Sequence, residues 1–179
     1  MNEDQVAALE RERLIGMPRW EIRPERYMLI TGSRHWADRI RLYRACMEEY
    51  SKLALDDRGV PRSVILRHGA CPPRKLEGDL EQWGGADYMA NQWAKEFGVQ
   101  TDPHPALWDD YGDSAGPIRN SKMVDLGNDV CLCFPLKGSK GTRNCVVKAL
   151  DAGIPVRNYG TVSIYGIEPI EFEEEDDHE

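Results

Sequence analysis

The chain has 179 residues, of which 41% are hydrophobic and 30% are charged, and its formal net charge is −8. This length fits one domain, and the hydrophobic content is enough for a core, which excludes a wholly disordered chain. The acidic balance argues against non-specific binding to nucleic acid, which relies on Lys and Arg. No stretch is long and apolar enough to cross a bilayer, and the acidic start lacks the features of a secretory signal. We therefore expect a cytoplasmic protein that has no membrane partner.

Most of the negative charge lies at the C-terminus. Residues 171–179 contain seven acidic side chains and no Lys or Arg, so we predict a disordered acidic tail there. The five cysteines are odd in number and indicate a reducing compartment. Cys131 and Cys133 could form a metal pair, but they alternate within an apolar run. We expect buried strand thiols there and no metal site.

In chain order, residues 1–25 are predicted to form a helical extension that packs on the domain or on a second subunit. From residue 26 onward, strands and helices alternate. The expected strands are 27–31, 63–67, 99–103, 129–134 and 154–156, and the expected helices are 37–54, 85–97, 115–126 and 141–152. Residues 71–83 are polar and predicted to be a loop or lid, and 161–172 an extended segment at the sheet edge.

The strands are short apolar runs, which is typical of a parallel sheet covered by helices on both faces. We therefore predict an α/β fold over residues 26–170: a Rossmann-like three-layer sandwich with a mostly parallel sheet of five or more strands. Ligands of such sheets bind at the carboxyl ends of the strands, near the point where the strand order reverses. The loops that follow the strands are thus the places to search for a site.

The loop at residues 138–142 is the most informative of these. Gly138 and Gly141 allow close approach of the backbone, Ser139 and Thr142 offer hydroxyls, and Lys140 offers charge. The helix that follows would direct free N–H groups and its positive dipole end at the loop. We interpret it as a phosphate-binding loop, with a tight turn and an N-cap Thr as the alternative. Neither a Walker A loop nor a Gly-x-Gly-x-x-Gly pattern is present.

Other residues could complete such a site. Arg119, in the first turns of a helix, would be well placed if it faces an anion, although a solvated Arg is the alternative. Asp87 could bind a ribose hydroxyl, act as a base, or simply favour its helix N-terminus. Trp108 and Tyr111 could stack on a base or cover the core.

Five motifs occur together in a fixed order. They are Ile30–Arg34, His68–Ala70, Gly84–Asp87, Ala115–Asn120 with Met123, and Gly138–Thr142 with Asn144. This set resembles the SLOG superfamily of Rossmann-like proteins, in its YspA-like branch, over roughly residues 26–157. The superfamily includes the lonely-guy phosphoribohydrolases and DprA. The resemblance implies a Rossmann-like fold and a nucleotide-derived ligand.

The chain departs from the phosphoribohydrolases at their catalytic positions. Cys145 stands where their signature has a catalytic Glu, and their Arg-Lys pair is matched only as Arg119-Asn120. The resemblance therefore implies phosphate binding by this chain, but it does not imply the hydrolytic chemistry of those enzymes. Residues 74–83 form an insertion relative to the branch and could cover the ligand.

The first hypothesis is a sensor or sequestering protein for a nucleotide derivative such as ADP-ribose, NAD or a signalling nucleotide. It requires no further cofactor, and we expect a homodimer or higher oligomer in a bacterial cytoplasm, encoded by a bacterium or a phage. The alternatives are a nucleotide hydrolase, with Asp87 and Cys145 as catalytic candidates, and a structural or assembly protein. The predicted ligand-binding residues are Thr31, Gly32, Ser33, Arg34, His68, Gly69, Asp87, Arg119, Asn120, Lys122, Gly138, Ser139, Lys140, Gly141 and Thr142.

Overall fold

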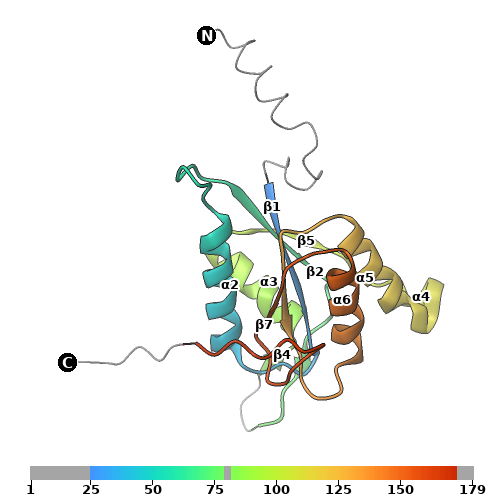
Figure 1. The fold of residues 1–179 in the computed structure, drawn as a ribbon. Helices are drawn as coiled ribbons and strands as arrows, with labels where there is room; N and C mark the ends of the chain where they lie inside the picture. The colour runs from blue at the N-terminus through green and yellow to red at the C-terminus, as the bar shows by residue number, and fades with distance from the viewer. Residues whose placement is uncertain (1–24, 79–81, 173–179) are drawn as a thin grey trace.

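A computed structural model describes residues 25–78 and 82–172 (Figure 1). The predicted extension over 1–25, apart from its last residue, and the tail beyond 172 lie outside the described residues. The elements are β1 (Glu25–Gly32), α2 (Arg39–Leu53), β2 (Ser63–His68), β3 (Arg74–Lys75), β4 (Trp83–Gly84), α3 (Ala86–Phe97), β5 (Gln100–Pro103), α4 (Trp108–Tyr111), a 3-10 turn (Gly112–Ser114), α5 (Ala115–Asp125), β6 (Val130–Phe134), α6 (Lys140–Asp151) and β7 (Val156–Asn158).

Five strands form one sheet in the order β5-β2-β1-β6-β7, and every neighbouring pair is parallel. In the register, Tyr27 lies beside Ile65 and Ile30 beside Leu132. The order places β1 at the centre of the sheet. Successive strands are added on one side of β1 as β2 and β5 and then on its other side as β6 and β7, so the strand order, but not the strand direction, reverses between β1 and β6. The predicted α/β fold with a parallel five-stranded sheet is therefore confirmed.

Helices cover both faces of this sheet (Figure 1). Met28 and Ile30 of β1 pack in one core cluster with residues of α2 and α3, including Trp93. Leu29 points to the opposite face and packs with Met123 of α5 and Cys145 of α6. All three β1 residues are fully buried, which explains why the strand reads as a continuous apolar run. The layers are those of a Rossmann-like sandwich.

The predicted helix over 37–54 is present as α2. Its apolar side chains do not all face inward, because Ile40 and Met47 are exposed. The residues that α2 buries are Leu42, Ala45, Cys46 and Glu49. The buried Glu49 interrupts the apolar stripe of the inward face, so that the stripe is hidden in the sequence.

Three further segments differ from expectation. Residues 161–172 form no strand; Ile164 and Ile167 bond each other across a turn in which Tyr165 and Gly166 have positive φ. After this turn, within the described residues, only single hydrogen bonds join the segment to β7, such as the one from the N–H of Ile170 to the oxygen of Asn158 at 2.7 Å. Within the segment predicted as a loop or lid, β3 and β4 form a short antiparallel ladder. The short helix α4 was not predicted. Cys131 and Cys133 are buried and free, as expected for strand thiols.

Candidate functional site

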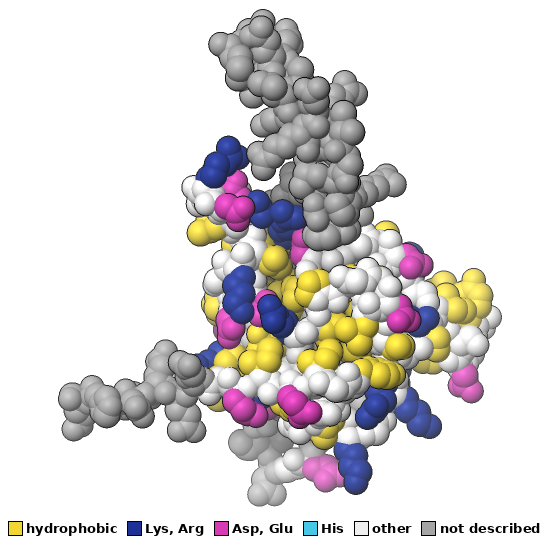
Figure 2. Space-filling view, in the orientation of Figure 1, with side chains coloured by type: hydrophobic (Ala, Val, Ile, Leu, Met, Phe, Trp, Pro, Cys, Tyr) yellow, Lys and Arg dark blue, Asp and Glu magenta, His cyan; other side chains and the backbone are white. Residues whose placement is uncertain are grey.

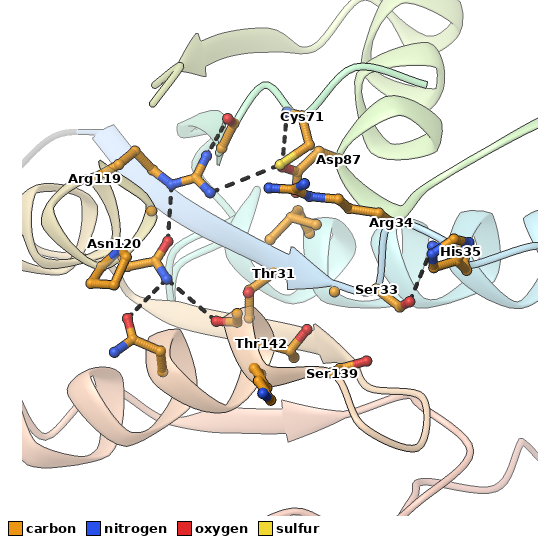
Figure 3. Close-up of a pocket in the computed structure, with 18 of the residues that line it drawn as sticks. Thr31, Ser33, Arg34, His35, Cys71, Asp87, Arg119, Asn120, Ser139 and Thr142 are labelled. Carbon is orange, nitrogen blue, oxygen red and sulfur yellow. Dashed lines mark hydrogen bonds between the residues drawn. The ribbon is translucent and has the colours of Figure 1, made fainter. Parts of the chain in front are cut away.

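The loops after β1, β2 and β6 meet at the carboxyl edge of the sheet, because these three strands are adjacent and parallel. They enclose a cavity of about 690 Å³, a size typical of small-molecule sites. The cavity lies where the strand order reverses, which is where ligands of such sheets bind. Figure 3 shows its walls, with α5 and α6 on one side and the start of α3 on the other.

The N-terminus of α6 forms one wall. The N-cap residue Ser139 does not cap the helix; its Oγ turns back and accepts a hydrogen bond of 3.1 Å from the N–H of Leu136. Thr142 lines the cavity and is 2% exposed, and its Oγ1 has no hydrogen-bond partner among the described residues. A Cβ added at Gly141 would meet nothing within 4 Å. An uncapped helix end, open space and an unused hydroxyl together fit an anion.

Arg119 extends from α5 across the cavity (Figure 3). Its Nε donates to Asn120 Oδ1 at 2.9 Å, and its Nη1 donates to the backbone oxygens of Gly69 and His104. A Cβ at Gly69 would lie 1.9 Å from Nη1, so this approach requires glycine. Its Nη2 donates to Cys71 Sγ at 3.8 Å. The acceptors are neutral groups, which position the guanidinium without neutralising its charge.

Asn120 joins α5 to α6 through hydrogen bonds of its side chain. Its Oδ1 accepts from Arg119, while its Nδ2 donates to the backbone oxygen of Gly141 at 3.3 Å and to Asn144 Oδ1 at 3.0 Å. The side chain is buried, and its amide is fully used by these bonds. Asn120 therefore acts by positioning Arg119 and the start of α6.

The charge of the cavity is opposite to that of the chain. Five Lys and Arg side chains and two Asp side chains line it; they are Arg34, Arg74, Arg119, Lys137, Lys140, Asp87 and Asp113. Within residues 25–78 and 82–172, none of the five basic side chains forms an ion pair with an acidic residue. A chain of net charge −8 thus gathers unpaired cations at one place, which favours an anionic ligand.

Asp87 lies on the opposite wall, in the first turn of α3. Its carboxylate is buried and accepts a hydrogen bond of 3.2 Å from the N–H of Cys71. Burial and the neighbouring Asp87 raise the pKa of the Cys71 thiol, so Cys71 is not activated as a thiolate. Asp87 is the buried carboxylate of this cavity.

Most predicted ligand-binding residues line the cavity, but three predicted site residues do not. Cys145 is fully buried in the core beside α5, and burial raises its pKa to about 11. The raised pKa disfavours the thiolate, so Cys145, a catalytic candidate of the hydrolase alternative, is unsuited to be a nucleophile. His68 is buried outside the lining, and Lys122 is exposed on α5 away from it.

Sequence reasoning missed six polar or ionisable cavity residues: His35, Cys71, Arg74, Asp113, Lys137 and Asn144. Lys137 could have been found, because it precedes Gly138 in the same loop. Arg74 could not, because it lies in the insertion, whose path the sequence does not show. Trp108 lines the cavity, whereas Tyr111 does not. Within the described part of the chain, no three His, Cys, Asp or Glu side chains gather to hold a metal ion.

Fold and cavity together define a class: α/β proteins with a parallel sheet of Rossmann-like strand order and a basic cavity at its carboxyl edge. Over 140 residues the chain is 39% identical to the Gene 61 protein of Mycobacterium phage D29, and the match covers 75% of this chain and 97% of that protein. The chain belongs to the family of this phage protein. No family model and no solved structure matches it. None of the helices in the described residues is long and apolar enough to span a membrane.

Proposed function

We propose that this protein binds a nucleotide-derived small molecule, such as ADP-ribose, NAD or a signalling nucleotide, and acts as a sensor or sequestering protein. The observation that carries the proposal is Thr142 Oγ1, a buried hydroxyl without a hydrogen-bond partner among the described residues, at the uncapped start of α6. A buried polar group without a partner costs free energy. A phosphate at this position would satisfy the hydroxyl and the first N–H groups of the helix together.

The charges of the cavity support a phosphate rather than a neutral group. Lys137 and Lys140 flank the start of α6, and Arg119 faces the same space from α5. A helix N-terminus carries a partial positive charge, so these cations and the dipole act in the same direction. The cavity volume of about 690 Å³ leaves room beyond a single phosphate, and the resemblance to the SLOG superfamily supports a nucleotide derivative. The related protein comes from a mycobacteriophage, which supports action in the cytoplasm of an infected bacterium.

The test measures binding by calorimetry and by thermal shift against ADP-ribose, NAD, AMP, ATP and cyclic dinucleotides. A ligand at 100 times its Kd should stabilise the protein by about 2.7 kcal/mol. Thr142→Val should weaken binding about tenfold or more, because it removes a hydrogen bond to a charged group. The same change should leave the free energy of unfolding of the ligand-free protein equal or higher, because the hydroxyl has no partner there.

A matched pair of lysines controls for charge. Lys140→Ala should weaken binding, whereas Lys122→Ala should not, because Lys122 lies outside the cavity. Equal losses for both variants, or no binding of any nucleotide to the wild type, would contradict the proposal.

The buried carboxylate of Asp87 in the cavity supports one alternative, a nucleotide hydrolase with Asp87 as general acid or base. Each bound nucleotide should therefore be recovered and analysed by chromatography. Recovery of intact ligand supports a sensor or sequestering protein. Recovery of products that disappears in Asp87→Asn, with binding retained, assigns the hydrolase instead.

A further inference from the structure

The short helix α4 carries a tryptophan on the wall of the cavity. Trp108 lines the cavity and is 46% exposed, whereas Trp36 and Trp93 are buried in the core. The helix projects beyond α5 (Figure 1), and hydrophobic side chains lie on its surface (Figure 2). The six-membered ring of the indole lies over α5, where a Cβ added at Gly116 would be 3.4 Å from Trp108 Cη2.

A guanidinium lies against the indole ring of Trp108. The guanidinium of Arg34, in the loop after β1, lies over the indole at 5.4 Å from its centroid. Arg34 lines the same cavity and has an exposed side chain. An indole and a guanidinium face are the two kinds of surface on which proteins stack nucleobases.

We propose that Trp108, together with Arg34, stacks the base of a nucleotide whose phosphate binds at the start of α6. This inference rests on the proposed function and deepens it, because it assigns the planar part of the ligand to a second place in the same cavity. The ligand class is then a nucleotide with an accessible heterocyclic base, and a sugar phosphate or free phosphate would be a weaker ligand.

The spacing of the two groups indicates how a base would enter. A ring inserted between two planes needs about 7 Å, since each contact takes about 3.5 Å. The observed 5.4 Å is too small, so Arg34 must move outward when the base enters. Its exposed side chain is free to do so, whereas Trp108 is held against α5.

The neighbouring exposed side chains allow the proposal to be separated from a protein-binding role. Leu107, Tyr111 and Ile118 are also exposed near Trp108 in the chain. None of these three lines the cavity. A surface for a second copy of this chain would depend on them as well, whereas base stacking depends on Trp108 and Arg34 and on none of these three.

The experiment measures Kd by calorimetry on the full chain for AMP, GMP, CMP and UMP and for ribose 5-phosphate, which has no base. The variants are Trp108→Ala, Trp108→Phe and the control Tyr111→Ala, an exposed aromatic on the same helix. The wild type should bind at least one nucleotide more tightly than ribose 5-phosphate. Trp108→Ala should weaken that nucleotide by about 5- to 150-fold, the measured range for losing one stacked base. It should leave ribose 5-phosphate unchanged, Trp108→Phe should retain most of the affinity, and Tyr111→Ala should have no effect.

Four results would overturn the inference. Equal affinity of the wild type for ribose 5-phosphate and all four nucleotides would reject base stacking but keep the phosphate site of the proposed function. A loss in Trp108→Ala that is the same for ribose 5-phosphate and the nucleotides would do likewise. A change of oligomeric state in both Trp108→Ala and Tyr111→Ala, without a change in Kd, would assign the α4 surface to a second copy of the chain. Failure of the wild type to bind any of the five compounds would reject the inference, and failure to bind ADP-ribose, NAD, ATP and cyclic dinucleotides as well would also reject the phosphate site.

Discussion

Gly32 and Gly69 stand at or just after the ends of neighbouring strands, and close approach rather than backbone angle requires both. Neither is among the glycines with positive φ. A Cβ at Gly32 would lie 2.4 Å from Ala86 Cβ and 2.9 Å from Phe134 Cβ, both of which belong to rigid elements. A Cβ at Gly69 would meet the end of the Arg119 side chain. The first contact holds α3 against the sheet, and the second positions a cation of the site.

Substitution of the two glycines by alanine should therefore have different effects on stability and on ligand binding. Gly32→Ala should lower the free energy of unfolding by about 1–3 kcal/mol, because the neighbouring Cβ atoms cannot move aside. Gly69→Ala should fold with smaller loss but displace Arg119, and so weaken nucleotide binding about tenfold or more. Urea denaturation and calorimetry on both variants check this. Unchanged affinity in Gly69→Ala would show that Arg119 does not need its present position to bind the ligand.

At the scale of elements, α2 shows how far apolar periodicity can be used. The pattern predicts a helix at this place, and one is present over Arg39–Leu53. It did not identify the inward face, because Glu49 occupies a core position that an apolar residue would normally mark. The carboxylate is tolerated there because Tyr159 Oη donates to it at 2.8 Å and Lys52 Nζ at 2.9 Å. Tyr159 is 110 residues away in the chain, so a single sequence does not reveal the pairing.

The hydrogen bond between Tyr159 and Glu49 can be tested directly. Burial and the bond to Glu49 raise the pKa of Tyr159, so the phenol remains a donor throughout the neutral range. Tyr159→Phe should lower the free energy of unfolding by about 1–3 kcal/mol, because a buried carboxylate loses a donor. The control Tyr165→Phe alters an exposed side chain and should cause no change. Equal effects in both variants would show that Lys52, with Arg157 Nε at 3.9 Å, satisfies Glu49 without Tyr159.

The part of the candidate site that was easiest to predict is the set of loops that follow the strands. Parallel strands bring their following loops to one edge, so the loops after β1, β2 and β6 could be placed together from the sequence. Helical phase was the harder problem, and Lys122 shows why. Successive residues rotate by about 100° around a helix, which places Lys122 about 60° from Arg119 and outside the arc that includes Gly116, Asn120 and Met123. The orientation of α5 decides which arc faces the cavity, and that orientation depends on packing.

At the scale of the whole molecule, charge is distributed unevenly between the chain and its cavity. We expect the acidic total of −8 to oppose association with nucleic acids and the basic lining of the cavity to favour small anions. The arrangement favours a ligand that is small enough to enter the cavity completely. The acidic total follows from composition alone. The basic cavity is evident only in the three-dimensional structure, because its five basic side chains come from four separate segments.

The whole fold should weaken in mild acid because of His68. Burial lowers the pKa of this histidine, and its Nδ1 accepts a hydrogen bond of 3.1 Å from the N–H of Ala70, which requires the unprotonated nitrogen. In the unfolded chain a histidine has a pKa of about 6.5. The stability due to neutral His68 is therefore fully present above about pH 6.5 and is lost as the pH falls from there through the lower folded pKa.

Urea denaturation between pH 8 and pH 5 measures this effect. The wild type should lose stability below about pH 6.5 with a slope of up to about 1.4 kcal/mol per pH unit, the value for one proton. His68→Asn keeps an acceptor near the N–H of Ala70 but cannot be protonated, so its stability should be flatter over the same range. His35→Gln, a change at an exposed histidine of the cavity rim, should follow the wild type. Asp102 contributes separately at lower pH: burial acts to raise its pKa, but hydrogen bonds from Arg67 and His104 prevail and lower it, so its contribution is lost only below about pH 3.9. An unchanged slope in His68→Asn would show that another group causes the loss of stability in acid.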